Sequence, residues 1–228
     1  LMEYIASRPK VCRVPRTPAL FTPDADWNRP EWNNAPELTI REFMGAVPPF
    51  VPDVRARLMY HPDWIYVIFR VSDQYVRAVS STINGRVWED SCVEFFFSPD
   101  PGNPLAYFNL EVNCAGVPLF HFKDPAKPGA PLPSETDIRR IEIAHSIPGL
   151  VDPEITKPTI WTIGHRIPVE MLTAYGTVQR PAPGVRWGAN LYKIGDKTSN
   201  PHWMTWSPID HPVPNFHLPE QFGVIEFE

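Results

Sequence analysis

Cysteine is scarce in this sequence of 228 residues, and the few present show no bridging or metal-binding spacing. Cys12, Cys92 and Cys114 are odd in number, and no two of them form a Cys-x-x-Cys pair. A disulfide framework and a zinc site are therefore not indicated. Histidine is equally dispersed: no two of the seven lie two or four residues apart, so a transition-metal site is not favoured.

Positive charge and long hydrophobic runs are also in short supply. Lys and Arg number 21 against 26 Asp and Glu, the net charge is −5, and there is no dense basic run of the kind that nucleic-acid binding requires. No apolar stretch approaches the roughly 18 residues of a membrane span. We therefore expect neither nucleic acid nor a membrane as partner.

The beginning of the sequence leaves the localisation open. Met2 is followed by Arg8, Lys10 and Arg13 without a hydrophobic leader. The protein is either cytoplasmic or secreted with its leader removed.

Proline is the residue in excess. The 29 prolines amount to about 13% of the chain against a usual ~5%. Because proline interrupts helices and central strands, this density excludes an all-helical protein and places proline in loops, turns and strand edges. Only residues 168–172, which begin with proline, predict a short helical turn.

Short runs with a period of two predict strands along most of the chain. Residues 55–60 and 64–71 flank the turn 61–63 and should form an antiparallel hairpin. The other predicted strands are 37–43, 75–80, 92–98, 106–113, 117–122, 138–146, 159–168, 186–194, 203–206 and 223–227. We expect an all-β fold in one domain over residues 1–228: an antiparallel β-sandwich with jelly-roll-like, immunoglobulin-like layering and long proline-rich loops.

Two predicted strands should present polar side chains on a common face. In 92–98 the valine and two phenylalanines at alternate positions share one face, which sends Glu94 to the other. In 107–113 the same parity places Glu111 and Asn113 opposite the apolar side chains. If the strands pair, the two carboxylates and the carboxamides lie on one face.

That face should lie beside Trp88, which precedes the first of these strands. An aromatic ring next to carboxylates and amides suits a sugar, since a pyranose offers an apolar C–H face and a rim of hydroxyl groups. Carbohydrate binding is the function that this pattern favours.

Four segments, in order along the chain, resemble family 9 carbohydrate-binding modules and their DOMON-like relatives. Residues 88–96, Trp-Glu-Asp-Ser-Cys-Val-Glu-Phe-Phe, resemble the tryptophan-to-glutamate signature of the family. Residues 26–35 resemble its tryptophan-bearing opening segment, and residues 64–73 its hairpin strand that ends at an aspartate. Residues 216–223, followed by an apolar strand, resemble its closing segment.

The resemblance implies a β-sandwich that holds sugars, at the reducing ends of glycans in characterised modules, between two aromatic rings. Trp88 matches the first sandwiching tryptophan and Glu94 matches a sugar-bonding glutamate. The sequence departs from the family at two positions: Phe216 stands where the second tryptophan is found, and Glu111 stands in place of an arginine. An arginine-to-glutamate exchange reverses charge and hydrogen-bond polarity, so the ligand's identity does not carry over.

We therefore expect a non-catalytic protein that binds a mono- or oligosaccharide in carbohydrate catabolism, beside separate glycoside hydrolases. The expected ligand-binding residues are Trp88, Glu94, Glu111, Asn113 and Phe216. Trp203 and Trp206 are expected in the core.

No cofactor is expected. The resemblance permits a structural calcium ion without placing it, and the oxygen-rich loops 100–103 and 196–200 fit calcium and simple turns equally well.

Three alternatives stay open. Glu94 and Glu111 could serve as the acid–base pair of a glycoside hydrolase, although no G-x-S-x-G or H-E-x-x-H motif accompanies them. A DOMON-like domain could bind haem, which needs an axial methionine and histidine on one cavity. The candidates for that pair are Met59, Met171, Met204, His121 and His217. The sandwich could also bind another protein through its exposed face.

Overall fold

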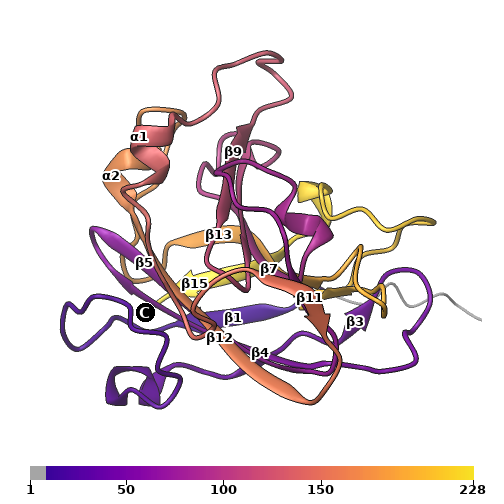
Figure 1. The fold of residues 1–228 in the computed structure, drawn as a ribbon. Coiled ribbons are helices and arrows are strands. Elements are labelled where there is room, and N and C mark those ends of the chain that lie inside the picture. Colours follow the sequence, from indigo (N-terminus) through magenta and orange to yellow (C-terminus); the bar gives the residue numbers. More distant parts are fainter. Residues whose placement is uncertain (1–8) are drawn as a thin grey trace, which may run out of the picture.

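Two large β-sheets pack face to face in the computed structural model, which describes residues 9–228 (Figure 1). The prediction about a leader concerned the segment from Met2 to Arg8, which lies outside the described residues. The predicted fold class, an all-β sandwich, is confirmed. None of the described helices is long and apolar enough to cross a membrane.

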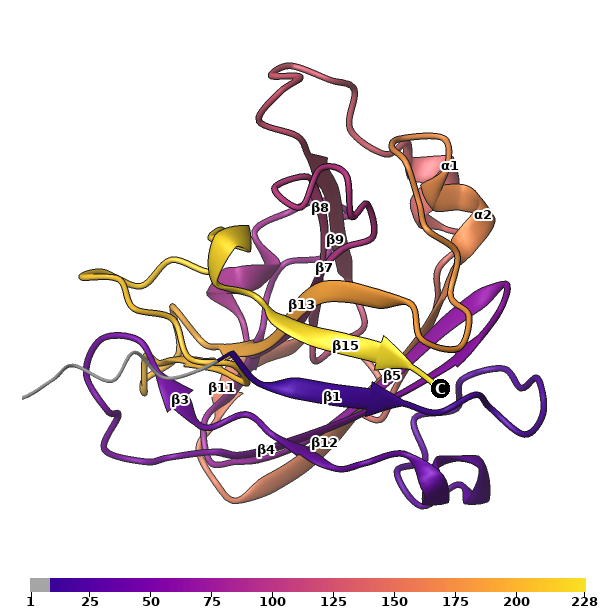
Figure 2. The same cartoon turned by 180° about the vertical axis from the view of Figure 1, so that it is seen from behind.

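The larger sheet has eight strands. Its main path runs β1 (Val11–Val14), β15 (Gly223–Phe227), β13 (Arg186–Ile194), β7 (Cys92–Ser98), β8 (Tyr107–Asn113) and β9 (Pro118–Lys123). The short strand β14 (Trp203–Thr205) pairs with β13, and β3 (Glu42–Phe43) pairs with β14. Strand β1, which the sequence pattern missed, lies parallel to β15, whereas the other pairings are antiparallel (Figure 2).

The smaller sheet has five strands in the order β10 (Glu142–His145), β12 (Thr159–Pro168), β5 (Trp64–Asp73), β4 (Asp53–His61) and β2 (Leu38–Thr39). Strands β4 and β5 form the predicted hairpin, in which His61 lies opposite Trp64. A separate two-stranded ribbon pairs β6 (Val76–Ala78) with β11 (Val151–Ile155).

The helices are short and lie between strands. They are α1 (Glu135–Ile138), α2 (Val169–Leu172) and the 3₁₀ turns η1 (Pro30–Asn34), η2 (Val87–Glu89) and η3 (Pro219–Gln221). The helical turn predicted at 168–172 is confirmed as α2.

Two predicted strands were wrong in extent. The run 37–43 is divided, because β2 joins β4 in the smaller sheet while β3 joins β14 in the larger one. The run 138–146 begins only at β10, because Ser134 caps α1 by accepting a hydrogen bond from the amide of Asp137. In both places a tertiary or capping interaction overrides the local alternation.

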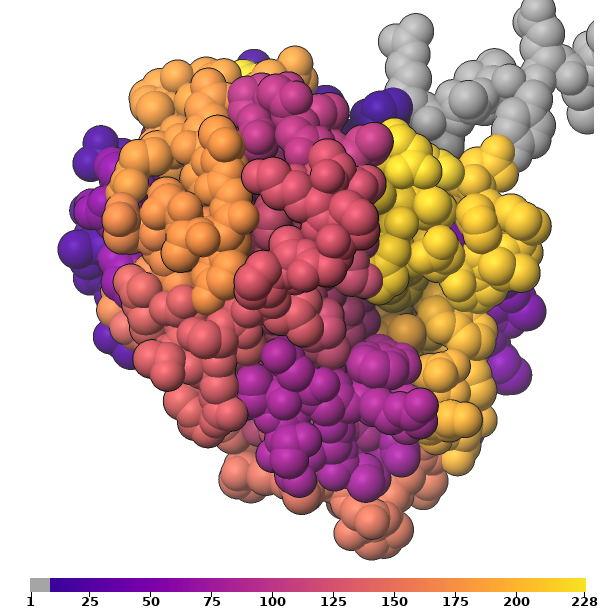
Figure 3. Space-filling view, turned by 90° about the horizontal axis from the view of Figure 1, so that it is seen from above, coloured from indigo at the N-terminus to yellow at the C-terminus, as the bar shows by residue number. Residues whose placement is uncertain are grey.

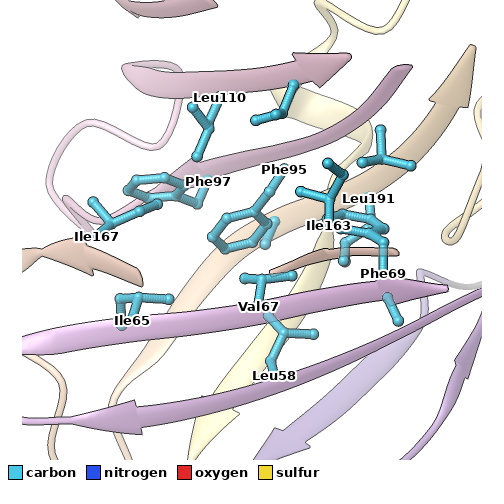
Figure 4. Close-up of a cluster of buried hydrophobic side chains, with 14 of the residues drawn as sticks. Leu58, Ile65, Val67, Phe69, Phe95, Phe97, Leu110, Ile163, Ile167 and Leu191 are labelled. Carbon is cyan, nitrogen blue, oxygen red and sulfur yellow. The ribbon is translucent and has the colours of Figure 1, made fainter. Parts of the chain in front are cut away.

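The core fills the space between the two sheets (Figure 4). Phe95, Phe97 and Leu191 of the larger sheet face Val67 and Ile163 of the smaller one, and all five are fully buried. Stacked phenylalanine rings, with the centroids of Phe95 and Phe97 4.9 Å apart, hold β7 in place. Since every second residue of β7 is committed to this core, the intervening residues must face outwards.

Candidate functional site

A cavity of about 680 Å³ lies on the outer face of the larger sheet. Its floor is polar and comes from adjacent strands: Glu94 of β7, Asn109 and Glu111 of β8, and His121 of β9. The remaining lining residues are Gly45, Trp88, Leu119, Lys123, Ile194, Asp196, Trp203, Pro214, Asn215, Phe216 and His217. In Figure 3 the yellow closing segment, the orange residues that follow β13 and the purple segment with η2 border one another on this face.

The strand register places the two floor glutamates opposite each other. Glu94 pairs with Glu111, and the flanking pairs are Val93 with Val112 and Phe95 with Leu110. Directly opposed residues of an antiparallel pair have Cβ atoms about 5 Å apart, so the two carboxyl groups are neighbours. The alternation that predicted a shared outer face is therefore confirmed for Glu94 and Glu111.

Three acceptor atoms of the floor have no hydrogen-bond partner within residues 9–228: Glu94 Oε1, Glu111 Oε2 and Asn109 Oδ1. Their side chains are at most 4% exposed, and the only hydrogen bond among them runs from Asn109 Nδ2 to Glu111 Oε1, at 3.1 Å. All three side chains line the cavity, so a ligand with suitable donors can hydrogen-bond to these acceptors.

Burial also changes the protonation of the floor. It raises the pKa of Glu111 from 4.5 to about 7, against the hydrogen bond from Asn109 and the charge of Lys123. Burial, and next the charge of Glu111, raise the pKa of Glu94 well above its usual range, although Lys193 acts in the opposite direction. Around neutral pH the two carboxyl groups therefore retain protons between them.

The indole of Trp88 reaches the cavity because two loops are bound together. Trp88 lies in η2 and is half-buried, and its carbonyl oxygen accepts a hydrogen bond from the amide of Asp196 at 3.5 Å. The next carbonyl, that of Glu89, accepts from the amide of Lys197 at 2.9 Å. These bonds join η2 to the loop between β13 and β14, and so bring Trp88 to the same cavity as Trp203.

Asp90 fixes the end of η2. Its buried carboxylate lies 2.7 Å from Arg77 and accepts hydrogen bonds from the amides of Val79 and Ser80 and from Asn113 Nδ2. Asn113, predicted as a ligand residue, is thus used in this network, is fully buried and does not line the cavity. The prediction had the correct parity but missed the loop that covers this end of β8.

The second tryptophan that lines the cavity is Trp203, whereas the sequence predicted Phe216 as the aromatic partner of Trp88. Phe216 lines the cavity but is only 6% exposed, and its ring stacks on Tyr192 with centroids 4.2 Å apart. Trp203, expected in the core, is half-buried and lines the cavity instead, whereas Trp206 is in the core as expected. Alternation in β14 contained the signal, because Met204 and Trp206 face the core and Trp203 must then face away.

A second cavity of about 540 Å³ adjoins the first. Lys123 and His217 line both cavities, and the loop after β9 encloses the second one. Lys123 Nζ lies 3.2 Å from His217 Nδ1, so these two side chains form the boundary between the cavities.

The structure does not bring together the residues considered for haem. Met59, Met171 and Met204 are buried in hydrophobic clusters away from the cavity that His121 and His217 line.

The two candidate calcium loops use their oxygen atoms internally. Asp100 Oδ1 accepts from the amide of Gly102, and Thr198 Oγ1 donates to the carbonyl oxygen of Gly195. Within the described part of the chain, no three His, Cys, Asp or Glu side chains form a group that could hold a metal ion. Structural calcium stays a prediction without a site.

The fold and the cavity together define a β-sandwich protein with a cavity on the outer face of its larger sheet. Residues 31–227 match the family model of Carbohydrate-binding family 9, and the chain therefore belongs to this family.

Solved structures agree with this assignment. A candidate carbohydrate-binding protein from Bacteroides uniformis ATCC 8492 is 30% identical, with a TM-score of 0.86 over 97% of this chain and 100% of that chain. A family 9 carbohydrate binding module from Caldicellulosiruptor kristjanssonii shares the fold at 15% identity and a TM-score of 0.65. It was solved with cellotriose and with glucose, and the matches cover 96% of this chain and 94% and 96% of that chain. Comparison with curated proteins finds no match.

Replacing Asp90 should destabilise the fold. Asp90→Ala leaves Arg77 without its buried partner and frees three donors, and we expect the free energy of unfolding to fall by about 3–5 kcal/mol. Urea unfolding measures the change. The control is Arg86→Ala, which removes the exposed ion pair with Glu89 and should change stability by no more than about 1 kcal/mol. Equal effects of the two variants would contradict the role given to Asp90.

The floor glutamates should impose a pH dependence on stability. A carboxyl group whose pKa rises on folding binds its proton more tightly in the folded state, so its stabilising contribution is present at low pH and lost as pH rises. For Glu111 the window runs from 4.5 to about 7. We expect the stability of the wild type to fall relative to that of Glu111→Gln as pH rises through this window.

Urea unfolding of both proteins across that pH range measures the difference. Comparing the two cancels contributions of opposite sign from buried histidines such as His202, whose pKa burial lowers to about 3. A difference that is constant with pH, or that turns in favour of the wild type as pH rises, would show that Glu111 is not protonated in the folded protein.

Proposed function

We propose that this protein binds carbohydrate without modifying it, and that the sugar occupies the cavity on the outer face of the larger sheet. The observation that carries this proposal is the presence in one cavity of two half-buried indoles and three buried acceptor atoms without partners. Trp88 and Trp203 offer apolar faces for the C–H surface of a pyranose, and the floor offers acceptors for its polar rim.

The proposed ligand residues follow from the cavity. Trp88, Glu94 and Glu111 are kept from the sequence prediction, Trp203 is added, and Phe216 is a wall residue stacked on Tyr192. Asn113 is left out of the contact set because it supports Asp90.

The size of the site supports a small ligand. The first cavity lies within the usual range of about 300–1,000 Å³ for small-molecule sites. The adjoining second cavity leaves room for an oligosaccharide that extends past Lys123 and His217.

The known ligands of relatives point in the same direction. The module from Caldicellulosiruptor kristjanssonii was solved with cellotriose and glucose, and the protein from Bacteroides uniformis is described as a candidate carbohydrate-binding protein. We further infer a role in carbohydrate catabolism, in which separate glycoside hydrolases cleave the glycan and this protein holds it.

Truncating either indole should weaken sugar binding. For Trp88→Ala and for Trp203→Ala we expect at least about a tenfold loss of affinity, which is about 1.4 kcal/mol of lost aromatic contact. Isothermal titration against a panel of mono- and oligosaccharides, at ligand concentrations up to millimolar, measures it. The control is Trp27→Ala, a half-buried tryptophan under Arg57 on another part of the surface, which should leave affinity unchanged. Unchanged affinity in both cavity variants would place the site elsewhere.

A glycoside hydrolase is the second candidate, because the neighbouring Glu94 and Glu111 have raised pKa values and face a cavity. Hydrolysis by two carboxyl groups requires them on opposite sides of the scissile bond. Here both groups rise from adjacent strands of the same floor and not from opposite walls of the cavity, so binding is the better-supported function.

We expect no turnover of chromogenic glycosides by the wild-type protein over hours at millimolar substrate. Release of the chromophore that persists through purification and disappears in Glu94→Gln, with the variant still folded by circular dichroism, would establish hydrolysis and overturn the non-catalytic proposal.

A further inference from the structure

The carboxyl groups of Glu94 and Glu111 face each other without a cation between them. They are cross-strand neighbours on β7 and β8, 2% and 4% exposed. Like charges directly opposite each other destabilise a sheet, and a cation normally accompanies such a pair. Within residues 9–228 no lysine or arginine nitrogen lies within 4.0 Å of either carboxyl group.

The groups that surround the pair do not supply the missing cation. From β9, Lys123 acts on Glu111 only at longer range and lies against His217, while His121 has its pKa lowered by burial. From β13, Lys193 is on the opposite face and pairs with the buried Asp73 at 3.5 Å.

The remaining neighbours are acidic or already hydrogen-bonded. Asp196 adds a further negative charge to the cavity lining. The hydroxyl group of Tyr107 is hydrogen-bonded to His217 Nδ1 and that of Tyr192 donates to the carbonyl oxygen of Phe216, and in the described part of the chain neither is hydrogen-bonded to the glutamates. The cavity thus has three acidic side chains, Glu94, Glu111 and Asp196, and one lysine in its lining.

The number and type of free acceptors match one chemical group. Glu94 Oε1, Glu111 Oε2 and Asn109 Oδ1 lack partners, and all three side chains line the cavity. An ammonium group has three N–H donors and no acceptor, together with a positive charge. A single hydroxyl group has one donor, and an acylated amine has one donor and no charge, so a neutral sugar needs several of its groups to do what one ammonium group does, and it brings no charge to the two carboxyl groups.

We propose that this cavity selects sugars with a free amino group, a hexosamine or an oligosaccharide of hexosamines, whose ammonium group is held by Glu94, Glu111 and Asn109. This inference rests on the proposed carbohydrate binding and names the class of sugar. The pyranose ring packs against Trp88 and Trp203 while its ammonium group points to the floor. Glu111, which stands in the strand after β7, determines the selectivity because it adds the second carboxylate.

Proton release accompanies binding. Around neutral pH the carboxyl pair retains protons before a ligand binds, because burial raises the pKa of Glu111 to about 7 and raises the pKa of Glu94 well above its usual range. The ammonium group favours both carboxylates, so the carboxyl O–H bond breaks and the proton passes to the buffer while the ligand amine keeps its own protons. A neutral sugar brings no charge and releases few protons.

Titration calorimetry of the full chain with glucosamine, glucose and N-acetylglucosamine tests the proposal. The titrations are made at about pH 6.5, where an amino group is protonated, in two buffers of different ionisation enthalpy. We expect glucosamine to bind at least about tenfold more tightly than the other two sugars, and a buffer-dependent enthalpy that reports proton release for glucosamine alone.

Matched variants locate the selectivity. Glu111→Gln and, separately, Glu94→Gln should each reduce the preference for glucosamine over glucose and the number of protons released, because only one of the two carboxyl groups remains. Glu170→Gln, which removes the same charge from an exposed position away from the cavity, should leave the preference intact. Thermal unfolding confirms that each variant is folded.

The outcomes separate this inference from the proposed function. If glucose binds as tightly as glucosamine and binding depends on Trp88, carbohydrate binding stands and the preference for an amino sugar is overturned. Preserved glucosamine selectivity in both glutamate variants would also overturn it. If no sugar binds at millimolar concentration, both the inference and the proposed function fail.

Discussion

The pairing of β7 with β8 is the constraint on which the rest of the site depends. The phenylalanines of β7 fill the space between the sheets and fix the direction of every side chain in that strand. Glu94 therefore has no orientation available except the outer face, where the register sets it against Glu111. The hydrophobic core thus supplies the free energy that holds two acidic groups together in a buried place, where repulsion and lost hydration would otherwise separate them.

Loops supply the aromatic walls of the cavity above the floor that the strands form. Asp90 ties η2 to the residues after β6, and backbone hydrogen bonds tie η2 to the loop that precedes β14. Trp88 and Trp203, distant in sequence, thereby line one cavity above the polar floor. The floor is formed by paired strands and the indoles are held through loops. This arrangement suits a ligand that stacks on aromatic rings at its sides and forms hydrogen bonds with the floor below it.

Much of this arrangement can be predicted from the sequence wherever strand alternation or turn composition alone determines it. Alternation placed Glu94 and Glu111 on one face, and the turn at 61–63 predicted the β4–β5 hairpin. Alternation failed for Asn113, because the loop with Asp90 takes this residue out of the cavity, and the family resemblance did not show that Tyr192 covers one face of Phe216. Trp203 is different, because alternation alone places it on the face opposite Met204. In a strand of three residues, however, the composition does not show which of the two faces is the core.

The central claim is that the sugar binds over the paired glutamates. A crystal structure of the protein soaked with glucosamine or glucose tests it most directly. The account predicts a pyranose ring against Trp88 and Trp203, with at least one of its polar groups within hydrogen-bond distance of Glu94 or Glu111. A sugar seated instead in the second cavity, against Leu105 and Leu132, or on the smaller sheet would contradict it.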